Sequence, residues 1–73
     1  MPATPQHRRL LGGAVRAKRK ELKFSQEKLA EKADLSTAFI SRVERGRECP
    51  SVDSLVKIAR ALKVRLRDLL ADV

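Results

Sequence analysis

Residues 25–46, SQEKLAEKADLSTAFISRVERG, read as two short helices joined by a turn that is too tight to be a linker. The first half carries apolar residues at helical spacing, with charge on most of the other positions: Leu29, Ala30 and Ala33. Asp34 to Ser36 separates the halves, and aspartate tolerates the left-handed backbone conformation that such a turn commonly needs. Two helices angled across a turn of about three or four residues form a helix-turn-helix.

The second helix of this stretch has two chemically different faces. Ile40 and Val43 fall on one side, which predicts the side that packs against the rest of the protein. Because successive helical residues are about 100° apart, the opposite side carries another set: Ala38, Ser41, Arg42 and Arg45. We expect this outward set to form the functional surface.

Serines mark the start of three of the expected helices. Ser25, Ser36 and Ser51 each precede a segment with apolar periodicity and can accept a hydrogen bond from the first helical turn. The periodicity predicts an all-α fold with helices at about residues 6–22, 25–33, 36–45, 51–62 and 65–71. Residues 1–5 hold two prolines and no apolar pattern, so we expect a short disordered arm there and a single domain over residues 6–73.

The composition favours a small protein with a polyanionic partner. The 73 residues include 17 lysines and arginines against 9 acidic residues, which gives a net charge of +8 and a pI near 10.6. No apolar run approaches the ~18 residues of a transmembrane helix, and there is no signal-peptide core, so we expect a soluble, cytoplasmic protein. The single cysteine, Cys49, agrees with a reducing compartment.

Functions that need covalent chemistry are disfavoured. The chain has one histidine, one cysteine, no glycine-rich phosphate loop and no paired ligands at metal spacing, so we expect no enzyme, no cofactor and no metal site. Its only aromatic residues are Phe24 and Phe39, too few for the stacking surfaces of modules that bind RNA or single strands. Duplex DNA is therefore the best-supported partner.

Several segments together resemble the Cro/C1-type (XRE) helix-turn-helix family of DNA-binding regulators: Ser25-Gln26, Leu29-Ala30, ISRVERG at 40–46, Pro50-Ser51 and the leucine-rich region 55–70. The resemblance spans about residues 11–70 of the chain. It implies a five-helix, lambda-repressor-like domain that binds double-stranded DNA. Small members of this family include phage repressors, restriction-modification controller proteins and antitoxins.

In such a domain the N-terminal half of the third helix enters the major groove. We expect four of its residues to read base edges: Thr37, Ala38, Ser41 and Arg42. Arg42 is expected to bind a guanine bidentately, and Thr37 and Ala38 to offer apolar contacts to a thymine methyl group.

Six further residues are expected to contact the DNA backbone: Arg16, Gln26, Ser36, Phe39, Arg45 and Arg47. Gln26 opens a helix whose N-terminus presents free N–H groups to a phosphate, and the resemblance implies that its side chain also braces Thr37. Phe39 lies on the flank of its helix. The sequence leaves two roles open for its ring, packing at the edge of the core or packing on the sugar-phosphate wall of the DNA. The basic residues up to residue 24, seven against one acidic, form either a solvated face or additional phosphate contacts.

Arg19 lies on the apolar stripe of the first helix with Val15 and Leu22, so it needs a partner. Glu44 lies only about 40° around the third helix from Ile40. We therefore expect a structural ion pair between Arg19 and Glu44 that ties the first helix to the third, and the resemblance implies the same pair. The alternative is that both long side chains extend to water.

Glycine is present where a helix is expected and absent where the family has it. Gly12 and Gly13 each cost the first helix about 1 kcal/mol relative to alanine, so either the helix frays there or a close contact requires small residues. The family usually has glycine at the positions of Lys23, Asp34 and Lys63. Because lysine adopts positive φ only at a cost, we expect these helix ends to close differently from the family pattern.

The C-terminal apolar residues exceed what one small core needs: Leu66, Leu69, Leu70 and Val73. We expect some of them to complete the core and the rest to form a homodimer interface. A homodimer would bind a pseudo-palindromic operator with half-site centres about 34 Å, or a multiple of this, apart.

We expect a transcriptional regulator that acts on its own promoter. The chain ends at Val73 without a ligand-sensing domain, so control is expected from concentration, dimerisation or a protein partner such as RNA polymerase, with no small-molecule ligand. The competing hypothesis is an antitoxin-like module whose main partner is another protein.

Overall fold

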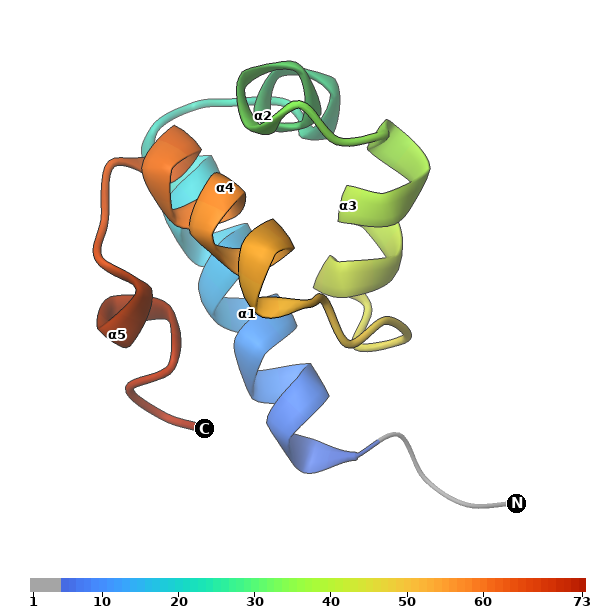
Figure 1. Ribbon diagram of the computed structural model, residues 1–73, viewed down its shortest axis with the longest axis vertical. Coiled ribbons are helices and arrows are strands. Elements are labelled where there is room, and N and C mark those ends of the chain that lie inside the picture. Colours follow the sequence, from blue (N-terminus) through green and yellow to red (C-terminus); the bar gives the residue numbers. More distant parts are fainter. Residues whose placement is uncertain (1–4) are drawn as a thin grey trace.

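The computed structural model describes residues 5–73, and over that range the chain forms helices and no strand (Figure 1). The helices are α1 (Gln6–Glu21), α2 (Gln26–Ala33), α3 (Thr37–Glu44), α4 (Val52–Leu62) and α5 (Leu66–Leu69). The expected all-α, five-helix fold is confirmed. The expected arm falls outside the described residues except for Pro5, which directly precedes α1. None of the described helices is long and apolar enough to cross a membrane.

The helices surround one hydrophobic core. In Figure 1, α1 and α4 lie in the middle, α2 covers one end of them, and α3 and α5 lie on opposite sides. α3 packs against α1 and α2, whereas α5 packs against α1 and α4. The largest fully buried side chains come from four helices: Val15, Leu29, Ile40, Val43, Ile58 and Leu62.

Serine side chains begin three of the helices, as predicted. The Oγ atoms of Ser25, Ser36 and Ser51 accept hydrogen bonds of 3.0 to 3.1 Å from backbone N–H groups three residues further on. A cap of this kind contributes about 1 kcal/mol. These caps fix where α2 and α3 begin, and so set the angle at which the chain enters α3.

We expected the C-terminal ends of α1, α2 and α4 to close differently from glycine-capped helices, and the structure corrects this expectation. Lys23, Asp34 and Lys63 all adopt the left-handed conformation, with φ of 61°, 56° and 59°. The next residue in each case donates its N–H to a carbonyl five residues back, at 2.9 to 3.0 Å, as in a glycine-capped helix. That next residue is apolar and packs against the core at each of the three ends: Phe24, Leu35 and Val64. The hydrogen bond and the apolar contact offset the cost of positive φ.

Gly12 marks the point where α1 passes under the end of α3. A Cβ atom added at Gly12 would collide with the backbone oxygen of Val43 and lie 2.8 Å from that of Glu44. A Cβ atom at Gly13 would meet nothing within 4 Å. Of the two possibilities left open by the sequence, the close contact holds for Gly12, and α1 is continuous through both residues.

Candidate nucleic-acid interface

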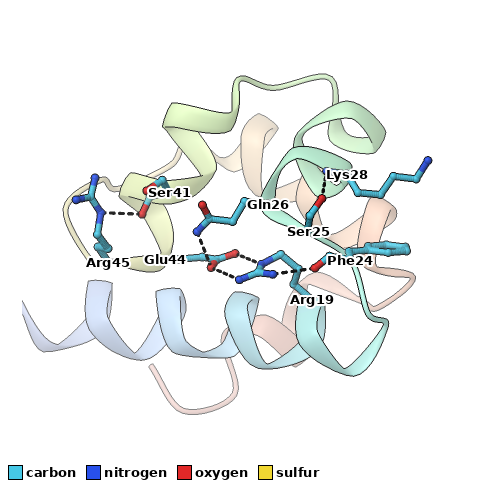
Figure 2. A network of polar contacts seen from close by, with 8 residues as sticks. All are labelled: Arg19, Phe24, Ser25, Gln26, Lys28, Ser41, Glu44 and Arg45. Atoms are coloured by element: carbon cyan, nitrogen blue, oxygen red, sulfur yellow. Dashed lines mark hydrogen bonds and ion pairs between the residues drawn. The ribbon is translucent and has the colours of Figure 1, made fainter.

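An ion pair under the C-terminal end of α3 ties this helix to α1 (Figure 2). Arg19 Nε donates to Glu44 Oε2 at 2.7 Å, and Arg19 Nη2 donates to Glu44 Oε1 at 3.0 Å. The two side chains are only 10% and 2% exposed. The hydrogen bonds to Glu44 raise the pKa of Arg19 above its ordinary value, against the lowering effect of burial. The expected pair is present, and neither side chain extends to water.

Two further hydrogen bonds complete this network. Arg19 Nη1 donates to the backbone oxygen of Phe24 at 2.8 Å, and Gln26 Nε2 donates to Glu44 Oε1 at 3.1 Å. The expectation that the Gln26 side chain braces Thr37 is therefore wrong. Glu44 takes the Gln26 amide because a buried carboxylate requires donors for its lone pairs, whereas Thr37 is exposed at the other end of α3.

The opposite side of α3 faces solvent. Thr37, Ala38 and Arg42 are exposed, and Ser41 is partly exposed. The structure thus brings the four residues predicted to read bases onto one surface of one helix. Their contacts with bases remain predictions.

A hollow of about 240 Å³ lies beside this surface, where α1, α2 and α3 meet. It is lined by Arg16, Arg19, Gln26, Ser41, Glu44 and Arg45. Arg45 Nε donates to the backbone oxygen of Ser41 at 3.3 Å, so this side chain folds back along α3 (Figure 2). Because Glu44 neutralises Arg19, the charges left at the rim are the exposed guanidinium groups of Arg16 and Arg45. Such a hollow is suited to an anion.

The remaining residues expected to contact the DNA backbone lie around α3. Ser36 is exposed, although its hydroxyl oxygen is occupied by the N–H of Phe39. Arg47 is exposed in the loop between α3 and α4. Phe39 is half-buried and packs against the core, so part of its ring has the core-edge role and part is open to a ligand.

The sequence did not indicate a role for Glu48. Arg42 Nε donates to Glu48 Oε1 at 3.1 Å, which links the exposed side of α3 to the loop that follows it. The Phe39 ring lies on the same arginine, with 6.0 Å between the ring centroid and Arg42 Cζ. Periodicity cannot predict the first contact, because Glu48 follows the end of α3 and its position depends on the path of the loop.

The four C-terminal apolar residues that we expect to be shared between the core and a dimer interface divide into two groups. Leu69 is only 3% exposed and belongs to the core, so its assignment to an interface is corrected, and Leu66 is half-buried against the same core. Leu70 and Val73 are 37% and 55% exposed. A short helix has only one inward side, and Leu69 occupies it.

The arrangement of α2, turn and α3 agrees with a match to a known family. A family model described as helix-turn-helix, HTH_3, matches residues 15–69, from the middle of α1 to the end of α5. The chain belongs to the HTH_3 helix-turn-helix family. The resemblance seen in the sequence is thereby confirmed.

The HTH_3 relatives include controller proteins and a phage repressor. Control protein C.BamHI of Bacillus amyloliquefaciens is 45% identical over 64 residues, which cover 86% of this chain and 79% of C.BamHI. The immunity repressor protein of Bacillus phage phi105 is 41% identical over 56 residues. These residues make up 77% of this chain but only 39% of the repressor. In fold, the restriction-modification controller protein C.AhdI from Aeromonas hydrophila matches with a TM-score of 0.87 and 31% identity, over 89% of this chain and 98% of that one.

Proposed function

We propose that the protein is a sequence-specific, double-stranded DNA-binding regulator of transcription. The observation that carries this proposal is the division of α3 into two sides. Ile40 and Val43 are fully buried and Glu44 is held by Arg19, whereas the side that carries Arg42 is exposed. A helix anchored in this way presents a rigid row of side chains to the major groove. The immunity repressor and controller proteins among its relatives support the proposal.

The exposed side of α3 supplies the base contacts in this proposal. Arg42 places its guanidinium on O6 and N7 of a guanine, which is the most common specific contact in the major groove. Thr37 and Ala38, in the first turn of α3, offer methyl groups to a thymine, and Ser41 can donate to or accept from a base edge.

In this proposal, phosphate contacts lie beside the exposed surface of α3. The N-terminus of α2 at Gln26 and the cations of Arg16 and Arg45 lie around one hollow, where a phosphate would gain both free backbone N–H groups and positive charge. Arg47 lies beyond the same C-terminal end of α3, in the loop that follows. Contacts of this kind fix the position of the protein on DNA without selecting a sequence.

The functional unit in this proposal is a homodimer on a pseudo-palindromic operator in the promoter of its own gene. One helix reads too few base pairs to select a site in a genome, and a two-fold axis doubles the site. The exposed Leu70 and Val73 support an interface at the C-terminal end.

The first test is whether the purified chain, alone and at physiological salt, protects a site in the DNA upstream of its own gene. A footprint with two related half-sites is the expected result. Absence of any protected site, together with stable binding to another protein from the same operon, would favour the antitoxin-like alternative.

The second test separates base reading from backbone contact. Arg42→Ala should weaken binding to the footprinted site by about 1–3 kcal/mol and relax preference at one base pair, because it removes a bidentate contact. Arg47→Ala should weaken binding to all sequences alike and reduce the salt slope by about one unit, because it removes one phosphate contact. Titrations over a range of salt concentrations and site variants measure both effects. Identical behaviour of the two variants would contradict the assignment.

A further inference from the structure

Glu48 binds the side chain that is proposed to read a guanine. The 3.1 Å bond from Arg42 Nε to Glu48 Oε1 joins α3 to the α3–α4 loop, and the two side chains are 45% and 34% exposed. The Phe39 ring lies near the same guanidinium, one turn earlier in α3, at the 6.0 Å limit of a cation–π contact. Arg42 is therefore exposed to a ligand but held at Nε by Glu48.

We propose that Glu48 is a specificity-determining residue that positions Arg42 for base readout, an inference that rests on the proposed function. A guanidinium presents its five N–H donors in one rigid plane. When Nε is held by Glu48, the two terminal nitrogens remain free, and their fork matches O6 and N7 of a guanine. Fixing the plane through Nε thus selects one orientation of the fork before DNA arrives.

The charge of Glu48 acts on all sequences alike. A carboxylate beside the groove repels phosphates, so Glu48 weakens binding to every sequence. That cost is offset only where the positioned Arg42 meets its guanine. Because this repulsion is common to both sites, it cancels in the ratio of the affinity for the correct site to the affinity for a site that lacks the guanine. The positioning of Arg42 is the effect that raises this ratio.

The experiment measures this ratio in Glu48→Gln. Wild-type protein first selects its site from a pool of duplexes with a randomised central segment, and Arg42→Ala identifies the base pair at which discrimination depends on Arg42. Dissociation constants are then measured for the selected duplex and for the same duplex with that base pair replaced. We expect the ratio to fall about two- to fivefold in Glu48→Gln, the scale of one exposed ion pair, with unchanged or tighter binding to the replaced duplex.

Two controls separate positioning from charge. Asp53→Asn removes the same charge from an exposed residue at the start of α4 that has no ion pair within residues 5–73, and it should leave the ratio unchanged. In an Arg42→Ala background, Glu48→Gln should cause no further loss of discrimination at that base pair. Thermal unfolding of Glu48→Gln should match that of the wild type, because the bond is exposed.

Three outcomes would overturn the inference. A ratio that stays constant or rises in Glu48→Gln would show that Glu48 is a bystander or competes with DNA for Arg42. A fall of equal size in the Arg42→Ala background would show that Glu48 acts on DNA directly. Wild-type protein that selects no sequence at all would contradict the proposed function and this inference with it, whereas the first two outcomes leave the proposed function intact.

Discussion

Gly12 and Gly13 are chemically identical neighbours in α1, but only one of them is required by the packing. The space above Gly12 is filled by the backbone oxygens of Val43 and Glu44, whereas the space above Gly13 is open. Since backbone atoms cannot rotate away as a side chain can, α1 and α3 must separate to admit a methyl group at residue 12. Such a shift moves α3, the helix that carries the proposed base contacts.

The pair provides a matched prediction. Gly12→Ala should lower the free energy of unfolding by about 2–3 kcal/mol through overpacking. Gly13→Ala should raise it by about 1 kcal/mol, because alanine favours the helix and meets no obstacle. Urea unfolding followed by circular dichroism measures both values. Equal effects of the two substitutions would mean that α1 and α3 do not pack as closely as the structure shows.

The buried pair of Arg19 and Glu44 gives a second prediction at this scale. Glu44→Gln keeps the shape of the side chain but leaves the charge of Arg19 without its counter-ion in a site that is almost closed to water. Loss of one partner of a buried pair lowers the free energy of unfolding by about 3–5 kcal/mol. We expect a decrease near the lower limit because the amide oxygen of the new glutamine still accepts one hydrogen bond. Glu31→Gln breaks an exposed pair of 3.6 Å with Lys28 and should change stability by less than about 0.5 kcal/mol. Wild-type stability of Glu44→Gln would rule out a structural role for the pair.

Among the helices, the starts could be predicted from the sequence and the ends could not. A cap at Ser25 or Ser36 depends only on the serine and the turn that follows, so local chemistry decides it. The end of α4 at Lys63 depends also on whether Val64 finds a place on the core, which is a property of the whole fold. The strain of a lysine at positive φ is therefore predictable from the residue alone, whereas the tertiary contact that outweighs this strain is not.

The end of α4 makes this cost measurable. Lys63→Gly should raise the free energy of unfolding by about 0.5–1 kcal/mol, because glycine adopts positive φ without strain and loses only part of that gain to its flexibility in the unfolded chain. Lys57→Gly, in the exposed interior of the same helix, should lower it by about 1 kcal/mol. Thermal and urea unfolding of both variants give the comparison. Destabilisation by Lys63→Gly would show that the lysine side chain has a stabilising contact of its own.

For the molecule as a whole, helical periodicity predicted the side of α3 that packs inward and the pairing of Arg19 with Glu44, because both follow from the position of a residue around a regular helix. Contacts that depend on irregular backbone were not predictable. Glu48 reaches Arg42 only through the path of a loop, and Leu69 and Leu70 differ in burial although both are leucines in one short segment. Sequence therefore predicts the helical surfaces of this domain better than the residues that adjust them.

That difference between Leu69 and Leu70 allows the proposed homodimer to be tested without unfolding the chain. Leu70→Glu places a charge at a site that is 37% exposed, so the monomer should fold normally while an interface at the C-terminal end is disrupted. Sedimentation equilibrium should show a dissociation constant for the dimer at least tenfold higher, which corresponds to about 1.4 kcal/mol. Binding to a full operator should weaken accordingly, and binding to a single half-site should not.

The control is Val52→Glu, which introduces the same charge at the first residue of α4, the most exposed of the large apolar side chains in the described residues. It should leave the dimer unchanged if the interface is at Leu70 and Val73. Dimerisation lost in Val52→Glu but kept in Leu70→Glu would move the interface to the start of α4. A wild-type chain that stays monomeric while it protects two half-sites would instead mean that DNA brings the two copies together, because a weak contact gains effective concentration when both copies are bound to neighbouring half-sites.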